Sequence, residues 1–128
     1  MLMKYEDIIE NKNVLSFIES IEIYNKLLAS IDLNNQEEAE CCEDFILSCI
    51  EYSEIRSKWI SFSREEKLNK DNLRTSIHNR VITNLNIIKR LIERRNGSIE
   101  WFNHFNEDRK RIGDFAAYLN YISGLNSR

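Results

Sequence analysis

The sequence predicts an all-α fold, a bundle of four to five helices with up-down type packing. Apolar residues recur at spacings of three and four along most of the chain, which is the period of an amphipathic helix. No window alternates apolar and polar residues for long enough to predict a strand. The 128 residues include 3 Gly and no Pro, a composition that excludes collagen and most turn-dense β-sandwiches. A chain of this length is expected to form one domain, residues 1–128.

The N-terminal part predicts a small element followed by a long amphipathic helix. Residues 4–10 are expected to form a short helix, or residues 1–10 a loosely ordered arm. The next helix is expected from Asn13 to Ile31, with residues 32–35 as the connection. Its apolar residues form a seam that suits antiparallel helix packing or a homodimer: Val14, Phe17, Ile21, Tyr24, Leu28 and Ile31.

Two longer helices are expected in the middle of the chain. The first begins near Asn35, carries several Glu residues where the helix dipole favours negative charge, and reaches about Ser61. Residues 63–66 read Ser-Arg-Glu-Glu, the S-x-x-E pattern of a capping box, and predict the start of the second. The second is expected to end at residues 94–97, with basic residues in its last turn and Gly97 at the cap.

The last part predicts a short turn of helix and a final helix. Ser98 is expected to cap the turn, residues 99–105, and Asn106 the final helix, which Gly124 ends. The predicted buried stripe of that helix consists of Ile112, Phe115, Ala116, Leu119 and Ile122.

The net charge of −3 hides an uneven distribution along the chain. Residues 1–54 carry 3 Lys and Arg against 13 Asp and Glu, whereas residues 55–128 carry 15 against 8. Acidic and basic helices could pack beside each other or against a partner subunit and cancel, which is the favoured interpretation. Alternatively, the basic half could present a patch to phosphate groups.

The cysteines and the hydropathy pattern predict a cytoplasmic protein. An odd number of cysteines within one helical segment favours free thiols in a reducing compartment, and their spacing lacks the pattern of a zinc site. They are Cys41, Cys42 and Cys49. No stretch approaches the roughly 18 apolar residues of a membrane span, and the first residues, Met1–Asp7, lack the basic region and apolar run of a secretory signal. We expect no membrane partner, no metal and no cofactor.

Residues scattered over the second half form a pattern. It reads Arg74-x-x-x-His78-Asn79-x-Val81-Ile82, then Asn86-x-x-x-Arg90-Leu91, then Asp108-Arg109-x-x-Ile112-x-Asp114-Phe115-Ala116. With this pattern, residues 71–123 resemble a family of small uncharacterised helical proteins of low-GC Gram-positive bacteria. The resemblance implies a helical fold and supplies no catalytic residues.

Three polar residues are predicted to meet in a buried cluster. Arg74 falls inside the apolar face of its helix, and His78 lies at the edge of that face. Asp108 is in line with the apolar stripe of the final helix. Because an unpaired buried guanidinium costs several kcal/mol, Asp108 is the expected partner of Arg74, with Glu43 or Asp44 as substitutes. A structural ion pair is favoured over a pocket in which His78 is an acid or base and Arg74 an anion clamp.

Arg74 and His78 also invite comparison with the HEPN ribonucleases, which use an Arg and a His on one helix. That family has four to six residues between the two, whereas this chain has three. One helical turn still places both side chains on one face. No serine nucleophile or glycine-rich loop accompanies them.

Two basic clusters flank the connection at residues 96–106 and are expected to converge in space. Aromatic residues lie between them, as in proteins that bind single-stranded nucleic acid: Trp101, Phe102 and Phe105, with His104. The predicted anion or nucleic-acid patch consists of Arg90, Arg94, Arg95, Arg109, Lys110 and Arg111.

These features lead to three functional hypotheses. The favoured one is a non-enzymatic helical protein that acts by protein–protein association, as a homodimer or with another protein. The alternative is a nucleic-acid-binding regulator that uses the basic clusters. The third is a HEPN-like ribonuclease that acts through Arg74 and His78.

Overall fold

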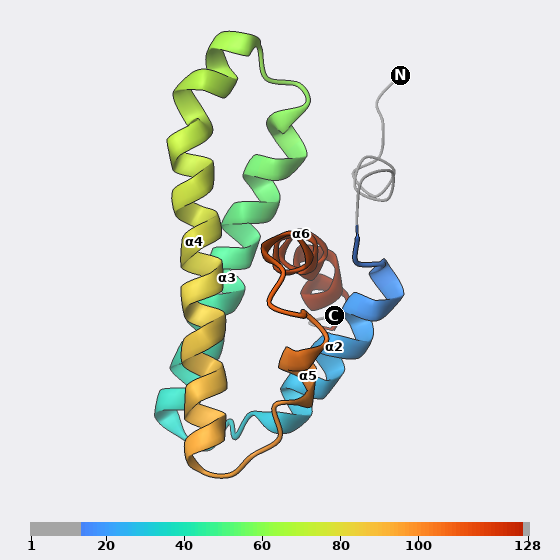
Figure 1. The fold of residues 1–128 in the computed structure, drawn as a ribbon, viewed down its shortest axis with the longest axis vertical. Helices are drawn as coiled ribbons and strands as arrows, with labels where there is room; N and C mark the ends of the chain where they lie inside the picture. The colour runs from blue at the N-terminus through green and yellow to red at the C-terminus, as the bar shows by residue number, and fades with distance from the viewer. Residues whose placement is uncertain (1–13, 127–128) are drawn as a thin grey trace.

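The computed structural model describes residues 14–126 (Figure 1). Its helices are α2 (Phe17–Ser30), α3 (Gln36–Trp59), α4 (Arg64–Arg94), α5 (Glu100–Asn103) and α6 (Arg109–Asn126). The described residues contain no strand, so the predicted all-α bundle is confirmed. The helix or arm expected within residues 1–10 lies outside the described range.

Helices α3 and α4 form a long antiparallel hairpin (Figure 1). Arg80 of α4 pairs with Glu51 of α3, whereas Arg95, directly after the last residue of α4, pairs with Glu38, earlier in α3. The capping box at Ser63 is confirmed, because its hydroxyl accepts from the Glu66 N–H and its own N–H donates to the Glu66 carboxylate. The sharp start of α4 at residue 64 thus follows from the local sequence.

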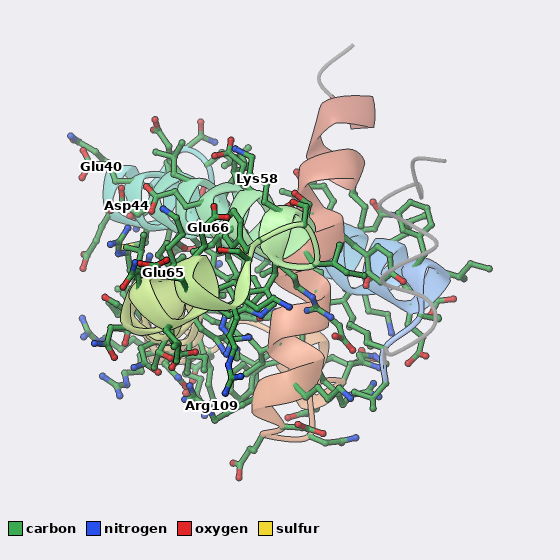
Figure 2. All side chains as sticks on the ribbon, turned by 90° about the horizontal axis from the view of Figure 1, so that it is seen from above. Glu40, Asp44, Lys58, Glu65, Glu66 and Arg109 are labelled. Atoms are coloured by element: carbon green, nitrogen blue, oxygen red, sulfur yellow. The ribbon has the colours of Figure 1, made fainter. Side chains whose placement is uncertain are left out.

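Helix α6 is the centre of the bundle. It runs across the α3–α4 hairpin and separates it from α2 (Figures 1 and 2). Every residue from Ile112 to Leu119 is buried, so the predicted stripe is confirmed and the opposite side of the helix is buried as well. The small residues Gly113, Ala116 and Ala117 let neighbouring helices approach on several sides. Antiparallel packing therefore holds for α3 and α4, whereas α6 crosses them.

Helix α2 begins at Phe17, later than expected, with a capping box formed by Ser16 and Glu19. Only part of the predicted seam of apolar residues faces the core. Phe17, Ile21 and Leu28 are half-buried, and Val14 is 45% exposed. Tyr24 and Ile31 of the seam are buried as predicted, and the other buried residues of α2 are Ser20, Ile23 and Leu27. More than half of the helix circumference is apolar, so the spacing alone does not fix which stripe faces the core.

Two predicted helix ends differ from the structure. At the end of α4, Asn96 rather than Gly97 takes the left-handed conformation, with φ 62°. The Gly97 N–H then donates to the Ile92 carbonyl at 2.9 Å, which completes a Schellman-type cap. Asn can adopt this conformation because its short side chain tolerates it. Gly97 is needed for space, since a Cβ there would lie 2.7 Å from Ile92 Cγ2.

At the start of α6, Asp108 caps the helix in place of the predicted Asn106. Its carboxylate accepts from the Lys110 N–H at 2.9 Å, and its carbonyl accepts from the Ile112 N–H. Asn106 and Glu107 both have left-handed backbones, with φ 54° and 56°, and turn the chain before the helix.

Candidate functional site

A buried ion pair joins three parts of the chain beneath the candidate site. The Asp114 side chain is 0% exposed, and its Oδ1 accepts from Arg56 Nη2 at 2.8 Å. Its Oδ2 accepts from the N–H groups of Val14 and Leu15, at 2.8 and 3.1 Å. These charge-assisted bonds satisfy a carboxylate that has no access to water. They fix α6 against α3 and against the segment that leads into α2.

The sequence prediction omits both Arg56 and Asp114 as site residues. The available signal was Asp114 itself, because it is the one charged residue between Ile112 and Leu119. A carboxylate within such an apolar stretch needs a buried partner. Arg56 carries no comparable signal, since it is one of two cations in the last turn of α3, with Lys58.

His78 of α4 lies half-buried beside this ion pair. Its ring packs on Tyr52 with centroids 4.9 Å apart, and its Nε2 lies 3.1 Å from the Arg109 carbonyl oxygen. Because a carbonyl only accepts, Nε2 is the donor. Burial lowers the pKa of His78, and the nearby guanidinium groups of Arg109, Arg56 and Arg74 lower it further, against the hydrogen bond to the Arg109 carbonyl.

The predicted pair of Arg74 and Asp108 is wrong. Arg74 pairs with Asp71 at 3.0 Å and lies over the Trp59 ring, 4.3 Å from its centroid. Asp108 is exposed, because it precedes the first residue of α6 and acts as a cap. A helical wheel of α6 that is extended back to Asp108 therefore wrongly places this residue on the buried side of the helix. Arg74 and His78 lie one helical turn apart on α4, and Asp108 does not join them.

The six predicted patch residues do not form one surface. Arg95 donates to Glu38, at 2.7 and 2.8 Å, and to the Ser30 carbonyl. Arg109 instead donates to Asn79 at 2.8 Å. Asn79 lies 11 residues before Arg90 and 16 before Arg95, which corresponds to a rise of about 16 and about 24 Å at 1.5 Å per residue, so the two clusters are separated along α4.

The remaining four patch residues differ in their contacts and exposure. Arg111 donates to the carbonyls of His104 and Val14 and to Glu19, so it is a structural residue. Arg90, Arg94 and Lys110 are exposed. The aromatic residues between the clusters are buried in the core and offer no stacking surface: Trp101, Phe102 and Phe105.

Part of the charge asymmetry is neutralised inside the molecule. Salt bridges between the acidic and basic halves join α2 to α6 and α3 to α4. Their N···O distances are 3.2, 2.7 and 2.8 Å for Glu19–Arg111, Glu38–Arg95 and Glu51–Arg80. The interpretation that acidic and basic helices pack beside each other agrees with these contacts.

The far end of the α3–α4 hairpin, residues 56–76, is the least covered part of the described structure. None of these residues is buried, and the hairpin end extends past α6 (Figure 1). Ile60, Leu68 and Leu73 are 53%, 73% and 50% exposed. Several exposed apolar side chains within one short stretch of the chain favour an interaction surface there.

Cations surround the apolar side chains of the hairpin end. Lys70 lies over the Phe62 ring at 5.7 Å, in the same manner as Arg74 over Trp59. Within residues 14–126, neither Arg64, Lys67 nor Lys70 forms a salt bridge. The acidic residues here are Glu65 and Glu66, which Figure 2 labels, and Asp71. Glu66 accepts from the Ser63 N–H as part of the cap, and Asp71 pairs with Arg74.

The cysteines do not form a reactive or metal-binding group. Cys42 and Cys49 are buried, Cys41 is half-buried, and all three are free thiols whose pKa burial raises. In the part of the chain that the structure describes, no three His, Cys, Asp or Glu side chains gather as metal ligands would. Over the same range, no helix has the length and apolar content of a membrane span.

Comparisons with protein-family models, with curated proteins and with solved structures find no match to this chain. The class that the fold and site define is a helical bundle with one hairpin end that carries no buried residue within residues 14–126. The similarity of residues 71–123 to a Gram-positive helical family stays a prediction.

Proposed function

We propose that this chain is a non-enzymatic protein that acts by associating with another protein chain through the end of its α3–α4 hairpin. The observation that carries this proposal is the exposure of Ile60, Leu68 and Leu73 on two helix ends with no buried residue between 56 and 76. A second copy of the chain is the simplest such partner.

The energetics favour association at this end. Isolated helix ends gain little stability on their own, because most helix stability comes from packing of an apolar face. Covering the exposed side chains of Ile60 and Leu68 with a partner would contribute roughly 1.5–3 kcal/mol for each fully buried side chain.

Site-specific photo-crosslinking tests the proposal in the cells that make the protein. A photoreactive amino acid at position 68 should give a discrete adduct with a protein, identified by mass spectrometry as a second copy or another chain. The matched control is the same amino acid at position 33, since Leu33 is 67% exposed at the opposite end of α3. Equal adducts from both positions, or none from position 68, would contradict the proposal.

A nucleic-acid-binding role is the second candidate, favoured by the cation–aromatic pairs of Arg74 with Trp59 and Lys70 with Phe62. Aromatic rings beside cations can stack with bases. Here the chain's own cations lie over those rings, so a base would have to displace them. Binding of single-stranded RNA that weakens steeply with salt would support this candidate.

A further inference from the structure

We infer that Asn96 and Gly97 form a self-modifying site, at which the Asn96 side chain loses its amide nitrogen as ammonia when the C-terminal cap of α4 opens. The chain contains a single Asn that is followed directly by Gly. The site lies beside Arg95, which bonds to α2 and α3. This inference does not depend on the proposed function.

The reaction closes a succinimide ring between the two residues. The Gly97 nitrogen gives up its proton to solvent and attacks the side-chain carbonyl carbon of Asn96. A C–N bond forms there, and the amide nitrogen leaves as ammonia. Water then opens the ring at either carbonyl carbon, which gives aspartate or isoaspartate, and no group is oxidised or reduced. Glycine favours the attack because no side chain shields its nitrogen.

The folded cap holds the Gly97 nitrogen in the wrong orientation for this attack. Its N–H donates to the Ile92 carbonyl at 2.9 Å, and the Asn96 N–H donates to the Glu93 carbonyl at 3.0 Å. The electron pair that attacks stands where the proton was, so in this geometry it faces the Ile92 oxygen and not the Asn96 side chain. Reaction therefore requires the cap to open.

The fold requires both residues of the site. Asn96 has φ 62°, a left-handed conformation that Asn adopts more readily than most residues. A Cβ at position 97 would lie 2.7 Å from Ile92 Cγ2, so a larger residue would have to displace Ile92. Asn96 is also exposed to water, which the ring-opening step consumes. The cap thus brings together the dipeptide and the co-reactant of the reaction.

Arg95 connects opening of the cap to the packing of α2 and α3. Its guanidinium donates to both carboxylate oxygens of Glu38, at 2.7 and 2.8 Å, and to the Ser30 carbonyl. The Glu38 side chain is 3% exposed and also accepts from the Asp32 N–H. Because Arg95 directly precedes Asn96, this buried pair resists fraying of the cap.

The product of the reaction disrupts the cap. Isoaspartate adds a carbon atom to the main chain within residue 96, so the hydrogen bond from Gly97 to Ile92 loses its geometry. Either product places a carboxylate at the C-terminal end of α4, where the helix dipole disfavours negative charge. The modified chain should therefore be less stable than the original chain.

Timed incubation of the full chain tests the inference. Folded samples in buffer and unfolded samples in guanidinium chloride are kept at the same mildly alkaline pH and digested. Mass spectrometry then follows conversion of each asparagine to aspartate or isoaspartate. Asn96 should convert fastest of all in the unfolded chain, and at least roughly tenfold more slowly in the folded chain. Equal rates in the two samples, or no preference for Asn96 in the unfolded chain, would overturn the inference.

Matched variants connect the reaction to the cap. Glu38→Gln weakens the pair with Arg95 and should speed conversion of Asn96 in the folded chain roughly threefold or more. Glu51→Gln makes the same change in the pair with Arg80 and should leave the rate within about twofold. An unchanged rate in folded Glu38→Gln would contradict control by the cap. If this variant does not fold, the ratio of folded to unfolded rates in the original chain decides.

Unfolding of the aged chain tests the consequence. Ion exchange separates deamidated chains by their added negative charge, and their unfolding midpoint should lie below that of fresh chains. Asn96→Gly should prevent the reaction and keep the cap, since glycine adopts the left-handed conformation freely. Its midpoint should therefore stay constant during the same incubation. Equal midpoints for deamidated and fresh chains would show that the product leaves the cap intact, against the inference.

Discussion

Asp114 accepts hydrogen bonds from a guanidinium and from two backbone N–H groups, in a position where water has no access. Arg56 is 22% exposed, so its charge remains partly hydrated while the carboxylate depends wholly on the protein. The loss of such a group leaves its partners unsatisfied, which costs more than the pair itself contributes.

Asp114→Ala is expected to lower the free energy of unfolding by about 3–5 kcal/mol. Arg56 and the N–H groups of Val14 and Leu15 would lose their acceptor. The control is Asp71→Ala, which breaks the exposed pair with Arg74 and should cost no more than about 1 kcal/mol. Urea unfolding measures both variants. Similar losses for the two would show that the buried pair is not an essential part of the core.

His78 is expected to make stability depend on pH. Its pKa in the folded chain lies below the usual value near 6.5, so the unfolded chain binds the proton more readily. Stability contributed by neutral His78 is therefore complete above about pH 6.5 and is lost as the pH falls towards the folded-state pKa.

His78→Gln should remove this dependence, because a glutamine amide can still donate to the Arg109 carbonyl and carries no titrating group. Thermal unfolding between about pH 5 and about pH 8 measures the difference between the two chains. The original chain should lose more stability on acidification than the variant. Parallel curves would rule out His78 as the source.

At the scale of the helix, local sequence determines where each element begins, and packing determines which side is buried. The capping box at Ser63 could be predicted because its residues bond to one another within one turn. The start of α6 could not, since Asn106 and Asp108 are both good caps and the left-handed turn at residues 106–107 selects the second.

Ser63→Ala is expected to loosen the hairpin end without unfolding the bundle. A lost cap costs about 1 kcal/mol, and residues 56–76 have no buried side chain to resist fraying. Hydrogen exchange should therefore speed up in the first turns of α4 while α6 stays protected. Ser16→Ala, which removes the corresponding cap of α2, should instead lower global stability. Equal protection of α4 with and without Ser63 would contradict this expectation.

Across the whole molecule, periodicity predicts the helices but not how they cross. The three-and-four spacing that gave the all-α class is a property of each segment alone. The contacts of Arg74, by contrast, depend on which residues the packing brings close to it. Arg74 lies over Trp59 of α3, and the carboxylate with which it pairs is Asp71 of its own helix. The central place of α6 had a visible signal in its small residues, Gly113, Ala116 and Ala117, which a one-sided helical wheel does not use.

The exposure of the hairpin end could not be predicted for a related reason. In sequence, Ile60 and Leu68 resemble any other apolar residues of an amphipathic helix. In the structure the hairpin end extends past α6 (Figure 1), and both side chains are exposed within residues 14–126. Which apolar residues stay exposed depends on how far each helix extends past its neighbours, and the sequence of a single helix does not show this.

The position of α6 also determines when the protein can fold during its synthesis. Helix α6 leaves the ribosome after the helices that it packs against, because it follows them in the chain. Until then, the inward faces of α2 and of the hairpin have no central helix to cover them, and nascent chains with such surfaces are prone to aggregate. Arrest of translation before residue 109 should therefore leave a chain that chaperones bind, and release of α6 should end that binding.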